Sequence, residues 1–160
     1  MSWLPEPVRA LLEKALVCEF TVVGDNGRPV THPLLPLWDG ERVYMTSSVL
    51  FSKKLEHIKR DPRVSLAITD RVATGGQQAR CVVQGDARVI EDDIHTTWEQ
   101  VLPLWRAKEP GIDFILGKRF ALPLFFERAI IEVRPRKVTW WEDGDPAKEP
   151  QVVAEAEVAA

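Results

Sequence analysis

The chain has 160 residues, of which 45% are hydrophobic and 28% charged, and its formal net charge is -3. This length suits one domain with its own core. No apolar run approaches the roughly 20 residues of a membrane helix, and the negative charge argues against binding along a nucleic-acid backbone. The N-terminal residues Met1–Glu6 lack the basic and apolar segments of a secretory signal, so we expect a cytoplasmic protein.

Cysteines and histidines are few and dispersed. Cys18 and Cys81 lie far apart in apolar, strand-like surroundings, which is typical of small core residues. His32, His57 and His95 show no spacing of metal ligands. We therefore expect no metal site.

The first third of the chain predicts a helix followed by antiparallel strands. Apolar residues recur at helical spacing and then give way to β-branched and aromatic residues around the hairpin turn 24–27. Pro33 and Pro36 cannot donate ladder hydrogen bonds, so their strand should be bent, bulged or partly unpaired. The expected elements are a helix at 6–16 and strands at 18–23, 29–38 and 42–46.

The rest of the chain predicts a short helix, further strands and a helical insert. Ser52 can cap the short helix, Gly85 marks a bulge, and Pro103 must kink or end a helix in the insert. A Pro-, Glu- and Ala-rich tail should be disordered or loosely docked. The expected elements are a helix at 52–60, strands at 64–69, 80–90, 129–133 and 137–141, the insert at 92–128 and the tail at 146–160.

These elements amount to about six strands with accessory helices. Hairpin connections favour closure into an antiparallel barrel, so the predicted fold is a mainly β, six-stranded antiparallel split β-barrel in a single domain at 1–145. The stretch 108–126 has the weakest pattern.

The residues with the clearest chemical meaning are two lysines at the start of the short helix. Lys53 and Lys54 oppose the positive end of the helix dipole, where acidic residues are normally preferred. Their placement is explained if a phosphate binds to the free N–H groups of that first turn. Two solvated surface lysines are the alternative.

Several motifs occur in the order and spacing of a known family. They are Gly27–Pro33, Leu37–Gly40, Tyr44–Ser48, Ser52–Lys54 and Asp61–Val64, with weaker matches at Val82–Ala87 and Ile130–Val138. Over residues 17–141 the chain resembles the pyridoxamine 5′-phosphate oxidase-like flavoproteins. The resemblance implies a split barrel that forms a homodimer and holds FMN in grooves between the two subunits.

The same resemblance implies a set of cofactor-binding residues. Lys54 matches the family's phosphate-binding basic residue best. Trp141 can stack on the flavin ring across the dimer. The full set of candidate cofactor-binding residues, in which Trp141 comes from its place on the final strand and the others from the resemblance, is Pro33, Leu35, Thr46, Ser47, Ser48, Ser52, Lys53, Lys54, Arg80, Gln84 and Trp141.

A flavin supplies the redox chemistry itself, so the lack of an acid–base constellation does not oppose catalysis. The expected function is hydride or electron transfer between FMN and a small substrate, with no catalytic residue or substrate identified. A deazaflavin (F420) reductase is one alternative, because Lys53, Lys59, Arg60 and Arg63 could bind its acidic tail. A non-catalytic flavin- or haem-binding protein is another. Pyridoxamine phosphate oxidation is disfavoured, because the C-terminal region lacks an Arg/His pair for the substrate phosphate.

A homodimer is also expected on physical grounds. Trp140, Trp141, Phe125 and Phe126 give the C-terminal half more large apolar surface than one small barrel covers. A second copy would cover that surface.

Overall fold

A computed structural model describes residues 2–50, 52–118 and 127–155. Eight strands, four α-helices and one 3-10 helix lie within these ranges. In chain order they are α1 (Glu6–Lys14), β1 (Cys18–Val23), β2 (Pro29–Leu34), β3 (Leu37–Trp38), β4 (Val43–Ser48), α2 (Lys53–Arg60), β5 (Arg63–Ile68), β6 (Arg80–Ile90), η1 (Thr97–Val101), α3 (Leu102–Lys108), α4 (Ile112–Leu116), β7 (Arg128–Trp141) and β8 (Gln151–Ala154).

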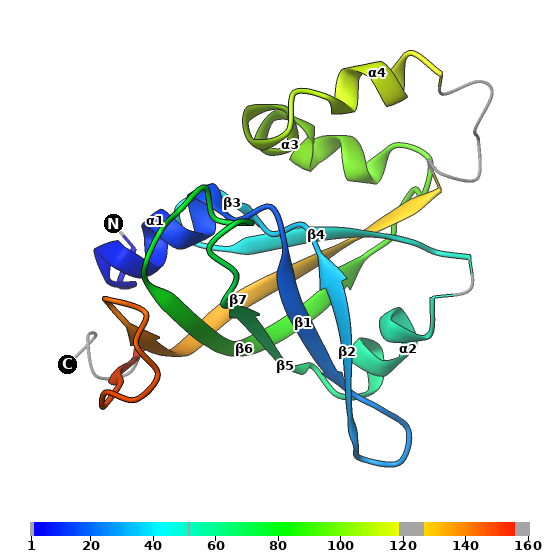
Figure 1. Cartoon of the computed structure of the whole chain (residues 1–160). Coiled ribbons are helices and arrows are strands. Elements are labelled where there is room, and N and C mark those ends of the chain that lie inside the picture. The colour runs from blue at the N-terminus through cyan, green and yellow to red at the C-terminus, as the bar shows by residue number, and fades with distance from the viewer. Residues whose placement is uncertain (1, 51, 119–126, 156–160) are drawn as a thin grey trace.

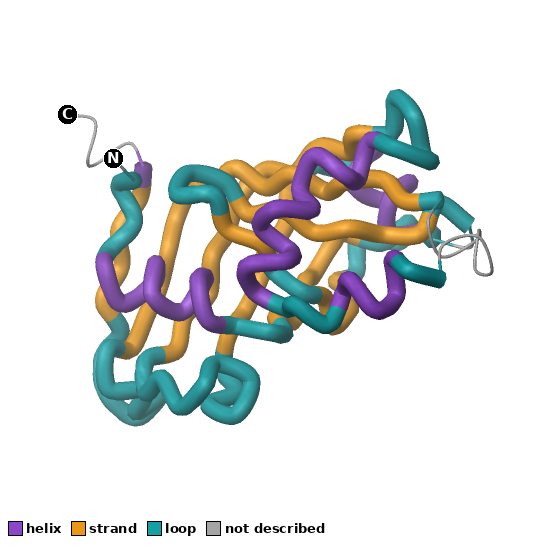
Figure 2. The backbone as a smooth tube through the Cα atoms, turned by 90° about the horizontal axis from the view of Figure 1, so that it is seen from above, coloured by secondary structure: helices purple, strands orange, loops and turns teal. Residues whose placement is uncertain are grey.

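The strands form one antiparallel sheet in the order β2-β1-β5-β6-β7-β4-β3, and β8 pairs with β7 outside this path. The sheet curls into a half-barrel (Figure 1), which confirms the predicted split-barrel class. Viewed from above, the strands cross the molecule and the helices lie around them (Figure 2). None of the helices in the described ranges is long and apolar enough to cross a lipid bilayer.

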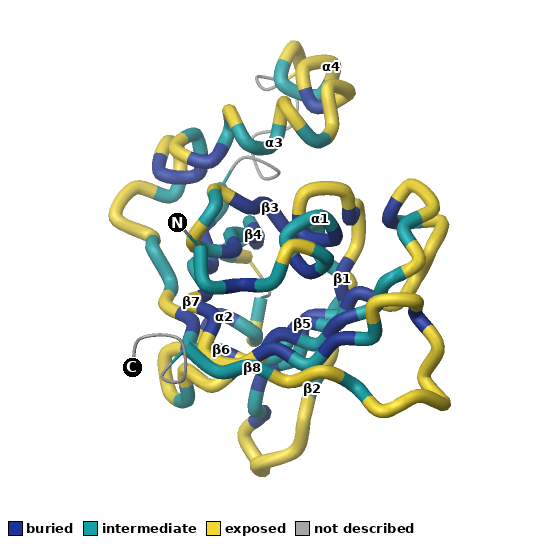
Figure 3. Tube along the Cα trace, turned by 90° about the vertical axis from the view of Figure 1, so that its left-hand side faces the viewer, coloured by how far each residue is buried: buried dark blue, intermediate teal, exposed yellow. Residues whose placement is uncertain are grey.

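The main core lies on one face of the curled sheet. Alternate residues of β1 and β4 are buried, as the two-residue period of a strand requires. Helix α1 adds Val8, Leu11 and Leu12, and α2 adds Leu55 and Ile58 to the same cluster. Buried segments therefore gather where the strands meet α1, while the turns are exposed (Figure 3).

Prolines decide where two of the predicted strands differ from the structure. The single strand predicted at 29–38 is broken at Pro36 into β2 and β3, which lie at opposite edges of the sheet. The two strands predicted at 129–133 and 137–141 are instead one continuous strand, β7. Pro135 is tolerated there because it faces the register shift between Gln84 and Gly85, which confirms the predicted bulge.

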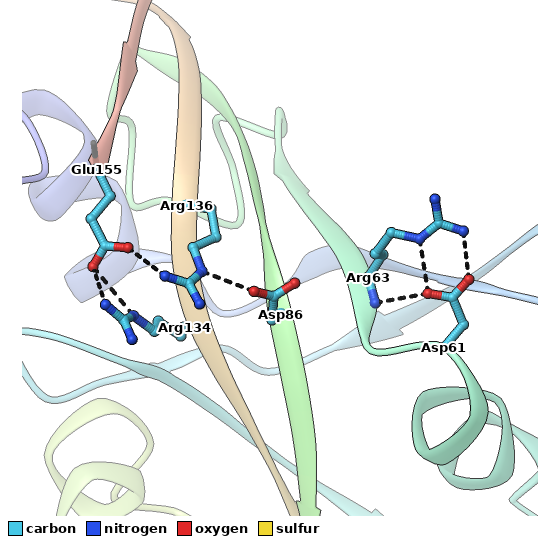
Figure 4. A network of polar contacts seen from close by, with 6 residues as sticks. All are labelled: Asp61, Arg63, Asp86, Arg134, Arg136 and Glu155. Carbon is cyan, nitrogen blue, oxygen red and sulfur yellow. Dashed lines mark hydrogen bonds and ion pairs between the residues drawn. The ribbon is translucent and has the colours of Figure 1, made fainter. Parts of the chain in front are cut away.

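Within the tail predicted at 146–160 to be disordered or loosely docked, residues 151–155 are paired or hydrogen-bonded, and residues 156–160 lie outside the described residues. On one side of β7, residues 128–133 pair with β4 and residues 137–140 pair with β8. Glu155 then accepts hydrogen bonds from Arg134 and Arg136, each at 2.7 Å, and Arg136 also donates to Asp86 at 2.8 Å (Figure 4). The unpaired edge of β7 therefore gives residues 151–155 a defined place.

The insert between β6 and β7 lies on the other face of the sheet. Its side chains form a second cluster with Leu37 of β3 and Ile130 of β7. Trp98 and Trp105 meet edge to face with ring centroids 6.3 Å apart, and Pro103 lies in the first turn of α3. Residues 119–126 of the insert, including Phe125 and Phe126 of the apolar-surface prediction, lie outside the described residues.

Candidate functional site

Three predicted site residues meet where β4 leads into α2. The Lys54 ammonium donates to the Ser47 and Ser52 hydroxyls, both at 3.0 Å, and the two hydroxyls lie 2.9 Å apart. Ser52 occupies the N-cap position of α2, but its side chain makes no capping hydrogen bond. The capping role predicted for that hydroxyl is therefore wrong, and the group belongs to the Lys54 cluster instead.

Lys54 is a half-buried cation whose hydrogen bonds go to hydroxyls rather than carboxylates. Burial lowers the pKa of its ammonium, and the positive charge of Arg128 lowers it further. Both effects penalise the charged form, as does the positive end of the α2 dipole. A negative group placed here would offset these penalties on the charged ammonium.

A groove of about 630 Å³ opens beside this cluster. Its walls come from the β1–β2 hairpin and from the first two turns of α2. Lys53 is exposed in the groove, while the His57 side chain is only 9% exposed. The lining residues are Gly24, Asp25, Asn26, Val30, His32, Ser52, Lys53, Lys54 and His57.

Arg128 is a site residue that the sequence did not predict. Its guanidinium donates to the Thr46 hydroxyl at 3.0 Å and to the Thr46 carbonyl at 3.2 Å, and it lies 5.8 Å from the centre of the Trp105 ring. Burial lowers its pKa to about 10. Arg128 thus joins the insert to β4, where Thr46 and Ser47 are neighbours. The one sequence feature that could have drawn attention to Arg128 is its position as a charged residue directly before the apolar run 129–131.

The other predicted residues near β2 and β4 have more ordinary surroundings. The Ser48 hydroxyl accepts a hydrogen bond from the Leu50 amide at 3.3 Å, next to the loop that precedes α2. Pro33 is exposed on β2, which is an edge strand. Leu35 is partly buried against the insert cluster.

Arg80, Gln84 and Trp141 are not among the described residues that line the groove beside Lys54. Helix α2 reaches the C-terminal end of β6, where Lys59 pairs with Glu91 at 2.6 Å. Arg80 is the first residue of that 11-residue strand, opposite Trp141 in the register. At about 3.3 Å per residue, the two ends of β6 are roughly 30 Å apart. Gln84 is exposed halfway along the strand.

A model of one protein family, described as pyridoxamine 5′-phosphate oxidase, matches residues 4–142. The chain belongs to this family. Among curated proteins, none matches the sequence significantly. Among the described residues, no group of three or more His, Cys, Asp or Glu side chains could hold a metal ion.

Solved structures of this family's fold resemble the chain over nearly its whole length. A protein from Clostridium acetobutylicum related to general stress protein 26 has 15% identity, a TM-score of 0.63 and 94% coverage of both chains. An F420 reductase has 22% identity and a TM-score of 0.61, with 87% of this chain and 99% of that chain covered. A haem-binding protein from Mycobacterium smegmatis has 17% identity and a TM-score of 0.64, with 96% and 59% covered. At these identities the similarity establishes the shared fold.

Proposed function

We propose that this protein is an oxidoreductase that binds FMN and transfers hydride or electrons between it and a small substrate. The observation that carries the proposal is the Lys54 ammonium, half-buried at the start of α2 and held by the hydroxyls of Ser47 and Ser52. The family match supports a cofactor of this class.

The residues at the start of α2 fit a phosphate monoester. Lys54 supplies a positive charge, and Ser47 and Ser52 supply hydroxyl donors on the same side. The first-turn N–H groups of α2 add donors and the positive end of the dipole. His32 contributes a buried Nε2 that has no hydrogen-bond partner within the described ranges. Charge, donors and an unpartnered polar atom therefore converge on one groove.

The salt bridges around α2 favour FMN over a deazaflavin with a long acidic tail. Lys59 pairs with Glu56 at 3.0 Å and with Glu91 at 2.6 Å. Arg60 pairs with Asp25, and Arg63 pairs with Asp61 at 2.6 Å. Three of the four basic residues that could attract an acidic tail, Lys59, Arg60 and Arg63, are thus already neutralised within the chain, whereas Lys53 is exposed in the groove. The groove suits one phosphate better than an extended polyanion.

The flavin would supply the redox chemistry, because its ring accepts and donates hydride and electrons. The chain's own residues would bind and orient it. Lys54, Ser47 and Ser52 would anchor the phosphate, while Thr46, fixed by Arg128, would lie beside the ribityl chain or ring at the end of β4. We assign no catalytic acid or base.

The distant predicted residues fit this function if the protein is a homodimer. Among the described residues, Arg80, Gln84 and Trp141 do not line the groove beside Lys54 of their own chain. The Trp141 indole donates to the Lys148 carbonyl at 3.0 Å, so its ring is held at the surface. A second copy could present these side chains to the groove, completing a site shared between two subunits.

The first test is the visible absorption spectrum of the purified protein, followed by titration of the cofactor-free protein with FMN and with F420. We expect a flavin spectrum and tighter binding of FMN than of F420. Lys54→Ala should weaken FMN binding by about 1.5–3 kcal/mol, the range for a hydrogen bond to a charged group. Lys59→Ala, which alters a paired surface lysine on the same helix, is the matched control and should bind nearly as the wild type does.

Other outcomes would redirect the proposal. A Soret band with no flavin affinity would indicate a haem-binding protein. A preference for F420 that is lost in Lys59→Ala would indicate a deazaflavin enzyme. Equal FMN binding by wild type and Lys54→Ala would remove the phosphate anchor on which the proposal rests.

A further inference from the structure

Two histidines line the groove next to Lys54, and the proposed phosphate anchor assigns neither of them a change of protonation. His32 lies on β2, opposite Phe20 of β1, and His57 lies one turn after Lys54 on α2. Nε2 of His32 and Nδ1 of His57 are both buried and have no hydrogen-bond partner among the residues that the structure describes. A buried nitrogen without a partner costs free energy, so a ligand or a proton is expected to satisfy each one.

The second nitrogen of His57 already has a negative neighbour. Nε2 lies 3.6 Å from the Asp25 carboxylate in the β1–β2 turn. Asp25 stays ionised, because a hydrogen bond from Arg60 lowers its pKa. Only the imidazolium form of a histidine can donate from both ring nitrogens at once. A protonated His57 could therefore face Asp25 with Nε2 while its buried Nδ1 also carries a proton.

The remaining charges around the pair are mainly positive. Burial lowers the pKa of His32, and the charges of Lys54 and His57 lower it further. From α2 the charged groups are Lys53 and Lys54 in the groove and Arg60, which is occupied by Asp25. The carboxylate beyond β6, Glu91, pairs with Lys59 instead. A dianion in the groove would therefore offset the positive charges that add to burial in opposing protonation of His32.

We propose that His32 and His57 make this groove a proton-coupled anion site, in which binding of a phosphate dianion next to Lys54 is accompanied by proton uptake on the histidine pair. The inference rests on the proposed function, because it concerns the same phosphate position. The direction follows from charge: a nearby negative group stabilises imidazolium over imidazole. Affinity for the dianion should then fall as the pH rises through the histidine range, by up to about tenfold per pH unit for each coupled proton.

The experiment is an NMR titration of the histidine ring protons of the full chain against pH. The sequence has only three histidines, and the exposed His95 of the insert serves as an internal reference. Three probes are compared with the ligand-free protein: FMN, inorganic phosphate, and riboflavin, which carries the same ring without a phosphate. We expect FMN and phosphate to raise the pKa of His32 or His57 by about one pH unit or more. Riboflavin should leave both unchanged, and His95 should not respond to any probe.

Variants separate proton coupling from a structural role. In the double variant His32→Gln, His57→Gln, FMN affinity between pH 6.5 and 8.5 should lose most of the pH dependence seen in the wild type. The NMR measurement uses wild-type protein, so it decides the proposal even if this variant folds poorly. Fluorescence titration of FMN in the same samples reports binding independently.

The outcomes distinguish failure of the proton coupling from failure of the proposed flavin function. If FMN binds and neither histidine responds, the proton coupling is refuted while the proposed function stands. If FMN does not bind but inorganic phosphate raises the histidine pKa, the anion site stands and the flavin function fails. If neither probe affects His32 or His57 and FMN does not bind, both proposals fail.

Discussion

Replacing Lys54 by methionine should separate binding from stability. Methionine keeps an unbranched side chain of similar length but removes the charge. The variant loses two hydrogen bonds of 3.0 Å, yet the Ser47 and Ser52 hydroxyls remain 2.9 Å apart and still satisfy one another. It also removes a half-buried cation whose burial is unfavourable, as its lowered pKa indicates. We therefore expect the free energy of unfolding of the ligand-free protein to change by no more than about 1 kcal/mol.

Ligand binding should respond very differently. A loss of about 1.5–3 kcal/mol raises the FMN dissociation constant by roughly 10- to 150-fold. At a ligand concentration about 100 times the wild-type dissociation constant, FMN stabilises the wild type by about 2.7 kcal/mol. At the same concentration it should stabilise Lys54→Met by only about 0.3–1.4 kcal/mol.

Urea denaturation followed by tryptophan fluorescence, with and without FMN, measures both quantities. Lys59→Met is the control, because Lys59 lies on the same helix but pairs with Glu56 and Glu91 at the surface. It should match the wild type in both conditions. A fall of more than about 2 kcal/mol in the unfolding free energy of ligand-free Lys54→Met would show that Lys54 is structural, and the reasoning from self-satisfied hydroxyls would be refuted.

Three further predictions concern the scaffold and the assembly. Gly85→Ala should destabilise the protein by about 1–3 kcal/mol, because the new Cβ would lie 2.3 Å from the Arg134 carbonyl oxygen. The control Gly117→Ala should be nearly neutral, because its new Cβ has no contact closer than 3.6 Å. Equal urea midpoints of the two variants would contradict this prediction. Lys108 donates to the Leu12 carbonyl at 2.5 Å, and burial lowers its pKa from 10.5 to about 8. Between about pH 8 and pH 10.5 the side chain of Lys108 is protonated in the unfolded chain but not in the folded chain. As the pH is raised through this range, the unfolding free energy of the wild type should therefore increase relative to that of Lys108→Met. A difference between the two proteins that does not change with pH would refute the effect of burial. If two subunits share the site, FMN should shift the monomer–dimer equilibrium toward dimer in light scattering on dilution, and a monomer that binds FMN at full affinity would rule out the shared groove.

Much of the fold could be predicted from local pattern. Helical spacing identified α1, and turn residues located the β1–β2 hairpin. Gly85 was identified as a bulge because a glycine inside a strand is costly without such a reason. Pro135 was misleading, because a proline within a strand ordinarily interrupts it. Only the pairing of β6 with β7 shows that it faces the bulge, where the ladder is already irregular.

Some residues of the candidate site could also be predicted from local sequence, and others could not. Lys54 was identifiable because a lysine in the first turn of a helix opposes the dipole, and Ser47 and Ser52 were named from the family resemblance. Arg128 could not be identified from the sequence, because its role depends on its position over the Trp105 ring and on its hydrogen bond to Thr46, which is 82 residues away in the chain. No local pattern encodes a contact of that range.

What the sequence determined by itself is where most strand-forming segments, the hairpin turn and the first two helices lie, together with the lysine that makes an anion site chemically reasonable. Those features depend on interactions between residues close in the chain, so their spacing is visible in one dimension. The tertiary structure decided which groups share the groove. It placed His32 of one hairpin beside His57 and Lys54 of α2, and it left Arg80 outside the described residues that line the groove. Burial and charge act through space, and the curl of the sheet sets which distant residues meet.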